Sequence, residues 1–376
     1  MNELTLLRDV RSTIEGPAPE SVIRGRNELL RRIAEENLAS LGAPAPAARK
    51  PRRLKTRRLT FAGLGALTAG VLAVALVLTN ILGLAGWRGS ADSAAASVLH
   101  EAAVSTIQLS DPVVHPGQYL LVATAAVYGT TAPDENGDNV SYLTITNDQV
   151  WVPADRNAEW IWQRNPSKPY QFFGAESEKT ARQNYDSSFG TVGNSSDLLS
   201  APAGAFYGTT SVASPEALGK LPRDPYQLLN YIYRTTIGSG SGPDVAAISF
   251  IADTLRTGVV PANLRAALYE AAAKVPGVEI TDQQATLDGR TGTAIGIVNQ
   301  NNHTRQDIII DPGTGQLIGE REILLEASPV DGYPAGTAFA WTAVTTSIVD
   351  TAPTGGTLLP EGCASTGANS MQCDPK

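Results

Sequence analysis

The stretch "QDIIIDPGTGQLIGEREILLE", Gln306–Glu326, contains two apolar runs separated by a turn signal. Pro312 fixes its own φ angle, and Gly313 and Gly315 can adopt positive φ. We therefore expect the chain to reverse direction at Asp311–Gly315 and to form a β-hairpin.

The sequence on either side of this hairpin repeats the same kind of pattern. The stretch "VEITDQQATLDGRTGTAIGIV", Val278–Val298, has a hairpin turn signal at Asp288-Gly289. Further strand patterns lie at residues 117–129, 141–153 and 160–163, and a last one at 337–349 precedes a tail rich in Pro and Gly. Hairpin-linked strands predict an antiparallel sheet.

A helical block interrupts the strand patterns. Residues 225–236 carry Leu228, Leu229 and Ile232 at helical spacing, and Asp244 is expected to cap residues 245–256. Pro261 is expected to start a helix over 261–275, with a buried stripe of Leu264, Leu268 and Ala271. A further helix is predicted over 90–107, and the polar stretch 175–200 is predicted to be a long loop. These elements predict the α+β fold class, with an antiparallel sheet and a helical block.

The N-terminal third contains a different kind of segment. Seven cations fall within Arg49–Arg58, and Leu59–Gly86 then passes 28 residues without a formal charge. As a helix this run would be about 42 Å long, which exceeds a hydrocarbon core of about 30 Å. We predict one transmembrane helix at 59–86. Cleavage after Ala94-Ala95-Ala96 is the alternative, but the run is too long and too far from the N-terminus for a signal peptide.

Charge predicts how this helix is oriented. Residues 1–58 hold 13 Lys and Arg against 7 Asp and Glu, a net of +6, whereas residues 87–376 hold 16 against 30, a net of −14. Flanks rich in Lys and Arg stay in the cytoplasm, and Trp favours the interface. The anchoring flank is Arg49, Lys50, Arg52, Arg53, Lys55, Arg57, Arg58 and Trp87. We expect a single-pass cell-membrane protein with a cytoplasmic N-terminus, in contact with membrane lipid.

The chain thus divides into four predicted parts. Residues 1–58 form a cytoplasmic helical segment with a basic linker, 59–86 the span, 87–352 an extracytoplasmic α+β domain, and 353–376 a C-terminal tail. Two short amphipathic helices in the first part cannot build a core of their own. They are expected to lie on the membrane surface, to dock on a cytoplasmic partner, or to form a weakly ordered tail.

The tail holds the two cysteines of the chain, Cys363 and Cys373. Outside the cytoplasm, a disulfide closing this short loop is the natural interpretation. A pair of cysteines with no histidine nearby is a poor metal site.

Motifs for catalysis are missing from the sequence. His100, His115 and His303 are isolated, and "DENGDN", Asp134–Asn139, departs from a calcium loop and suits a hairpin turn better. No spacing singles out a nucleophile, a carboxylate pair or a cofactor motif. We expect no enzyme activity, catalytic residue, metal or cofactor, and an acidic outer region without a basic stripe argues against nucleic acid.

Tryptophans supply the one candidate binding feature. Trp151, Trp160 and Trp162 fall close together, and alternation along a strand places Trp160 and Trp162 on the same face. Burial against the helical block is one interpretation. The other is an aromatic-lined cleft for an apolar ligand or peptide.

Several segments carry a resemblance to a known family. They are "MNELTLLRDVRSTI", "PGQYLLV", "LPRDPYQLL", "PANLRAALYEAAAKVPGVEI" and "IIIDPGTGQLIGEREIL". With the Arg-rich flank and single span, they resemble an uncharacterised actinobacterial family of single-pass membrane proteins often encoded beside an extracytoplasmic-function sigma factor. The resemblance implies an envelope protein with a regulatory link to transcription, and it carries no catalytic residue.

Two functional hypotheses are open at this point. In the first, the outer domain senses or binds a ligand and the N-terminal helices regulate a cytoplasmic sigma factor. Against this hypothesis, residues 1–58 hold no His or Cys and so lack the His-x-x-x-Cys-x-x-Cys element of zinc-type anti-sigma domains. In the second, the outer domain is an envelope binding or carrier module for an apolar ligand or lipid, with no signalling role. A lipoprotein-carrier-like half-barrel is a fold-level analogy for the second.

Overall fold

The structure is a computed structural model that describes residues 89–109, 111–191, 196–208, 211–328, 332–358, 363–367 and 370–373. The predictions for residues 1–88 lie outside the described residues. These include the N-terminal helices, the cationic flank with Trp87, and the span at 59–86. No helix among the described residues has both the length and the apolar character needed to cross a bilayer.

One large sheet dominates the fold. Within the described residues, eleven strands join in the order β11-β5-β3-β2-β1-β10-β9-β8-β7-β6, and β4 pairs with β2. The strands are β1 (Tyr119–Pro133), β2 (Asn139–Pro153), β3 (Glu159–Arg164), β4 (Lys168–Phe172), β5 (Asp197–Pro202), β6 (Glu279–Leu287), β7 (Arg290–Asn299), β8 (Thr304–Asp311), β9 (Gln316–Leu324), β10 (Ala338–Val349) and β11 (Thr357–Leu358). All pairs are antiparallel except β5 with β11.

The predicted hairpins are confirmed. Asp288 and Gly289, between β6 and β7, have φ angles of 48° and 74°, as a two-residue turn between twisted strands requires. Gly315, between β8 and β9, has a φ of 66°. Residues 134–138 form the turn between β1 and β2, and Asn139 begins β2 opposite Pro133.

A long-range pairing joins the two halves of the sheet. β1 lies beside β10, with Tyr119 opposite Val349 and Tyr128 opposite Ala340. This ladder joins the N-terminal strands β1–β5 to the C-terminal strands β6–β9, which are separated in sequence by a helical block.

The described helices are α5 (Ser93–Leu109), α6 (Ala175–Thr191), α7 (Pro215–Lys220), α8 (Pro225–Thr235), α9 (Pro243–Leu255) and α10 (Ala262–Ala272). Proline opens α7, α8 and α9, where its missing N–H costs nothing. The prediction that Asp244 caps α9 is wrong: Gly242 is the N-cap, and Asp244 instead accepts a hydrogen bond from the Tyr233 hydroxyl at 2.7 Å.

The predicted loop at 175–200 is also wrong, because it holds α6 and most of β5. The helix buries only a narrow stripe of small residues, among them Ala181, so its sequence has little apolar periodicity. An ion pair between Glu178 and Arg182 at 2.7 Å and one between Lys179 and Glu135 support it.

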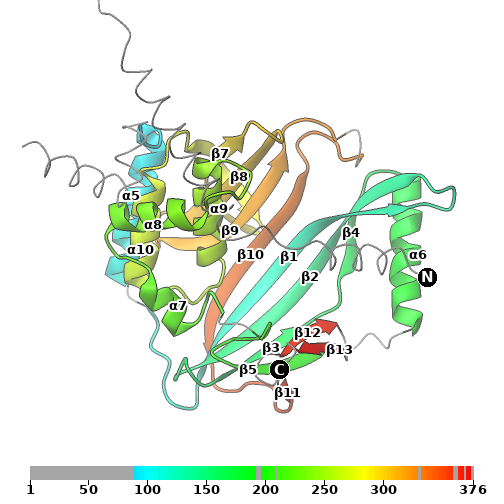
Figure 1. Ribbon diagram of the computed structural model, residues 1–376, viewed down its shortest axis with the longest axis horizontal. Coiled ribbons are helices and arrows are strands. Elements are labelled where there is room, and N and C mark those ends of the chain that lie inside the picture. The colour runs from blue at the N-terminus through cyan, green and yellow to red at the C-terminus, as the bar shows by residue number, and fades with distance from the viewer. Residues whose placement is uncertain are drawn as a thin grey trace, which may run out of the picture. The chain divides into compact units, whose positions relative to one another are not determined.

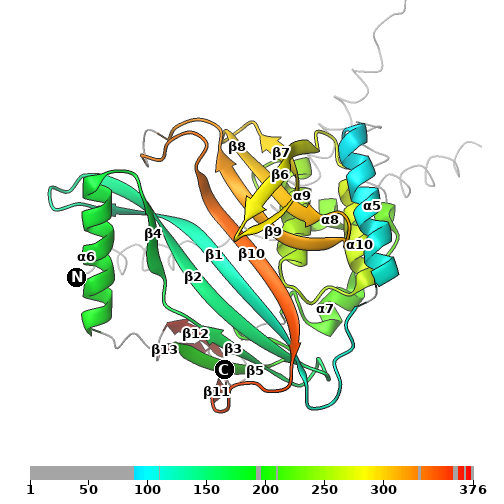
Figure 2. The same ribbon diagram turned by 180° about the vertical axis from the view of Figure 1, so that it is seen from behind.

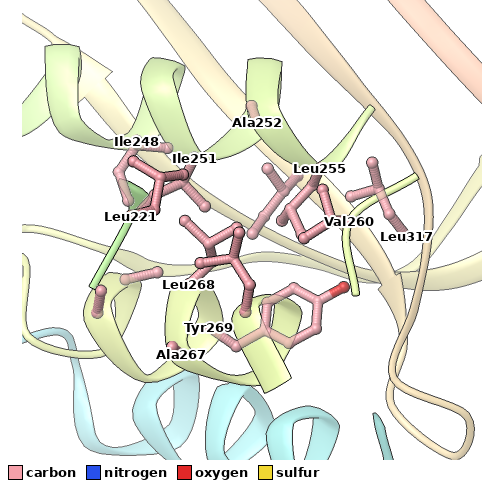
Figure 3. Close-up of a cluster of buried hydrophobic side chains, with 14 of the residues drawn as sticks. Leu221, Ile248, Ile251, Ala252, Leu255, Val260, Ala267, Leu268, Tyr269 and Leu317 are labelled. Carbon is pink, nitrogen blue, oxygen red and sulfur yellow. The ribbon is translucent and has the colours of Figure 1, made fainter. Parts of the chain in front are cut away.

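Helices α5, α8, α9 and α10 gather over β6–β9, whereas α6 lies at the other end of the sheet beside β4 (Figures 1 and 2). Their shared core is drawn in Figure 3, where Leu268 and Tyr269 of α10 lie against Ile251 and Leu255 of α9. The predicted stripes of α8 and α10 are buried here. Burial of each leucine or isoleucine in these stripes stabilises the folded chain by about 1.5–3 kcal/mol.

The opposite face of the sheet carries a smaller core. Val127, Leu143, Ile309 and Trp341 belong to it, and Tyr333 covers them from the loop before β10. Side chains alternate between the two faces of a strand. The sheet therefore buries apolar side chains on both faces, and the antiparallel sheet with its separate helices confirms the α+β prediction.

The C-terminal tail forms a separate small ladder. Strands β12 (Cys363–Gly367) and β13 (Ser370–Cys373) pair antiparallel, with Cys363 directly opposite Cys373. Opposed positions in such a ladder lie about 4.5–5.5 Å apart between Cα atoms, within the range that a disulfide spans. The disulfide remains a prediction.

Candidate ligand-binding cleft

A cleft of about 750 Å³ opens between the helix-covered face of the sheet and the helices α7, α8 and α9. This volume falls in the range of small-molecule sites. Two other hollows over the described residues are smaller, with volumes of about 90 Å³ and 300 Å³.

Strand alternation builds the floor of the cleft. Thr124, Ala126 and Tyr128 of β1 are two residues apart and point to one side. Residues Leu120 and Val122 continue this side of the strand into the main core. The floor is completed by Thr146 and Asp148 of β2, Trp162 of β3 and Thr342 of β10.

The helices and one loop supply the remaining wall. Its apolar and aromatic members begin with Tyr207 and Val212, which precede α7. Ala217 lies in α7, and Leu221 follows that helix. Tyr231 belongs to α8 and Phe250 to α9. Its polar members lie at the C-terminal end of α9: Asp253, Thr254, Arg256 and Thr257. The cleft thus combines apolar and aromatic side chains with the hydroxyl groups of threonines and tyrosines, and its charged groups lie at two places, Asp148 and the end of α9.

An aromatic corner surrounds Trp162. Its ring lies 5.3 Å from that of Phe206 and 5.7 Å from that of Tyr207. The guanidinium of Arg164 lies 5.3 Å from the Trp162 ring and forms an ion pair with Asp197 at 2.8 Å. These contacts hold the indole in place and show that it accepts a cation on its ring.

Asp148 is the polar group of this corner. Its Oδ2 accepts a hydrogen bond from Trp162 Nε1 at 3.2 Å, and its Oδ1 accepts one from the Asn165 backbone N–H at 2.9 Å. Burial raises the pKa of Asp148, and these two hydrogen bonds and the charge of Arg164 oppose that rise without cancelling it.

A second polar group lies at the end of α9. Arg256 forms ion pairs with Asp253 at 3.0 Å and with Glu320 of β9 at 3.2 Å. Burial raises the pKa of Glu320 to about 7, despite the opposing charge of Arg256. Burial lowers the pKa of Arg256, but Glu320, Asp253 and Tyr128 together outweigh it and the net shift is upward.

The three tryptophans proposed for the cleft have different positions. Trp162 lines it. Trp160 shares that face but is 3% exposed in the main core, and its Nε1 donates to the Arg156 carbonyl at 2.9 Å. Trp151 is buried at an odd-numbered position of β2, on the side opposite to Asp148.

Sequence reasoning missed most of the polar cleft residues. Asp148 carries a weak signal, since it is a charged residue in the middle of a strand on the same face as Val150 and Val152. Arg256 and Glu320 carry none, because only the tertiary fold brings the end of α9 to β9.

The histidines lie apart from the cleft. His100 contacts Glu270 and His303 contacts Glu326, and no histidine is among the lining residues. Across the part of the chain that the structure describes, no three His, Cys, Asp or Glu side chains are grouped to hold a metal ion.

Comparisons with known proteins add little to this picture. No family model and no curated protein matches the chain. A crystal structure of a DUF1329 family protein from Desulfovibrio piger is similar over 67% of this chain and 91% of that chain, with 10% identity and a TM-score of 0.16. A TM-score this low supports no conclusion about the fold or ligand of this chain.

Proposed function

We propose that the domain after residue 87 is an extracytoplasmic binding domain, and that its cleft holds a small amphipathic or apolar molecule. The observation that carries this proposal is the cleft itself, in which Trp162, Phe250 and Leu221 face a common space between sheet and helices. Its volume of about 750 Å³ equals that of about 25 water molecules, at about 30 Å³ each in the liquid. A site of this kind binds by apolar contact and orients its ligand with a few polar groups.

The cellular setting of this proposal comes from the sequence. The uncharged run 59–86 and the cations before it support a single-pass membrane protein with the binding domain outside. An envelope lipid or another apolar molecule of that compartment would reach the cleft from outside the cell.

Sensing and carrying share this binding step and differ in the fate of the bound molecule. In the sensor proposal, ligand binding is reported to a cytoplasmic sigma factor through residues 1–58. In the carrier proposal, the bound molecule is delivered and the N-terminal segment only anchors the chain. The family resemblance supports the sensor, and the apolar cleft supports either.

Hydrolysis is a second candidate because two carboxylates, Asp148 and Asp253, line the same cleft. A glycoside hydrolase needs two such groups. Against this role, Asp253 is held by Arg256 at 3.0 Å, and both oxygens of Asp148 already accept N–H donors. Binding without turnover is the function that this geometry supports better.

Photo-crosslinking tests the binding proposal. The full chain in lipid nanodiscs is exposed to a neutral C12 alcohol that carries a diazirine, and the adducts are mapped by mass spectrometry. We expect adducts on cleft residues of β1, β3 and α9. Adducts confined to other surfaces of the outer domain, or to residues 59–86, would contradict the proposal.

A matched pair of variants in α7 gives the control. Ala217→Phe places a ring into the cleft, whereas Glu216→Phe places the same ring on the exposed side of the same helix. Cleft labelling should fall about tenfold in the first variant and stay unchanged in the second. Release of a product from the ligand, lost on Asp148→Asn, would instead favour hydrolysis.

A further inference from the structure

The polar groups of the cleft indicate which head group its ligand carries. Resting on the proposed binding function, we infer that the cleft selects amphiphiles with an ammonium head group and that Asp148 is the counter-charge.

The charge balance of the cleft carries the first part of this inference. Its described lining residues include two carboxylates, Asp148 and Asp253, and one cation, Arg256. That cation is already paired with Asp253 and with Glu320 behind it. An anionic head group would have to compete with two carboxylates for Arg256. Arg164, whose charge also acts on Asp148, is paired with Asp197. A cation therefore still meets an excess of negative charge.

The hydrogen bonding of Asp148 leaves capacity for a ligand. A carboxylate offers about four lone-pair sites, and Trp162 and Asn165 occupy one on each oxygen. An ammonium group brings donors and a full positive charge to the remaining sites. Burial dominates the upward pKa shift of Asp148, which shows that the neighbouring protein groups compensate its charge only in part.

The rings of the cleft suit a cation as well. Trp162 donates a hydrogen bond to Asp148, and the Tyr207 ring lies 5.7 Å from the Trp162 ring. Tyr128 and Tyr231 line the cleft elsewhere. Aromatic faces attract ammonium groups, and a carboxylate beside them adds to the attraction. Arg164 already occupies such a position near the Trp162 ring.

The rest of the cleft suits an apolar tail. Ala126, Val212, Leu221 and Phe250 line it without offering a charge. An amphiphile can therefore place its head group against Asp148 and its tail between β1 and the helices.

Head-group selectivity of the unaltered chain provides the first test. Three C12 probes that differ only in the head group (primary ammonium, alcohol and sulfate) compete with the diazirine alcohol for cleft labelling of the full chain in nanodiscs. We expect the ammonium probe to compete about tenfold better than the alcohol, and the sulfate to compete worst.

Variants then assign the selectivity to Asp148. Asp148→Asn keeps an acceptor for the Asn165 N–H but removes the charge, so the advantage of ammonium over alcohol should disappear. Glu216→Gln removes one negative charge from the exposed side of α7 and should leave the advantage intact.

Two failures are distinguishable. If ammonium and alcohol compete equally at a labelled cleft, or if Asp148→Asn keeps the ammonium preference, this inference is overturned and the binding function stands. If no probe labels or protects the cleft, both proposals are wrong. The selectivity of the unaltered chain decides between these results even where a variant fails to fold.

Discussion

The indole Nε1 of Trp162 donates a hydrogen bond to Oδ2 of Asp148 at 3.2 Å, which joins β3 to β2 in the floor of the cleft. Both residues line the cleft, and the ladder places Trp162 opposite Val150, two positions beyond Asp148. The contact thus fixes the aromatic ring and the carboxylate relative to each other before any ligand arrives.

Replacing Trp162 by Phe removes this donor while a ring remains against Phe206. Hydrogen bonds to charged groups contribute about 1.5–3 kcal/mol, and the partial exposure of the site reduces that value. We expect the free energy of unfolding, measured by urea titration, to fall by about 1 kcal/mol. The exposed Tyr226→Phe should change nothing. Equal stability of Trp162→Phe and the unaltered chain would show that the bond is not important.

Glu320 makes stability depend on pH. Its pKa of about 7 lies above the ordinary 4.5, so the folded chain binds this proton more tightly than the unfolded chain does. The contribution of Glu320 to the free energy of unfolding should therefore be fully present below pH 4.5, fall as pH rises towards 7, and then level off. The upper limit of this effect is about 3 kcal/mol.

Glu320→Gln tests the assignment, because glutamine does not titrate. Urea unfolding at several pH values between 4.5 and 8 should show that the slope of the unaltered chain is reduced in this variant. The exposed Glu279→Gln is the control and should keep the slope. If the free energy of unfolding of Glu320→Gln varies with pH as much as that of the unaltered chain, groups other than Glu320 cause the pH dependence.

Gly315 holds the β8–β9 hairpin against α5 and α10. Its carbonyl accepts hydrogen bonds from the Tyr269 and Thr106 hydroxyls, both at 3.0 Å. A Cβ at this position would collide with Thr106 and with the Ala102 carbonyl, and the φ of 66° disfavours any side chain. We expect Gly315→Ala to lower the free energy of unfolding by about 3 kcal/mol.

Gly313→Ala in the same turn is the matched control, since its Cβ would meet only Asp311 Oδ1 at 3.3 Å. It should cost less than about 1 kcal/mol. Tyr269→Phe should cost about 1–2 kcal/mol, because the buried carbonyl keeps the Thr106 bond. If Gly315→Ala and Gly313→Ala lower the free energy of unfolding equally, the close approach of Gly315 to α5 is contradicted.

The cysteines provide a prediction about covalent structure. Cys363 lies opposite Cys373 in the β12–β13 ladder, and an outer location favours oxidation. The intact mass of the purified chain should increase by two hydrogens on reduction. Alkylation of both thiols without reductant would show that the disulfide is absent.

The regulatory proposal depends on residues 1–58. A pull-down with this segment at low salt should retain a sigma factor, and a scrambled segment of equal composition should not. A reporter fused after Lys376 should be active only outside the cytoplasm. If neither segment retains a sigma factor, the carrier proposal is the one that remains. A reporter that is active only in the cytosol would overturn the predicted topology.

Features that depend on neighbouring residues could be predicted from the order of amino acids alone. Alternation predicted β1 and β2, the turn residues Asp288-Gly289 and Gly315 predicted two hairpins, and helical spacing predicted α8 and α10. These signals are local, because a φ preference or an apolar period acts within a few residues. Polar α6 lacked such a period, and it was predicted to be a loop for that reason.

Which residues meet across the fold depends on its three-dimensional packing. The pairing of β1 with β10 and the position of α9 over β9 join segments far apart in the chain. They separate Trp162, which lines the cleft, from Trp160 in the core, and they bring Arg256 to Glu320. Long-range packing of two apolar faces sets these contacts, and no local preference of the chain encodes them.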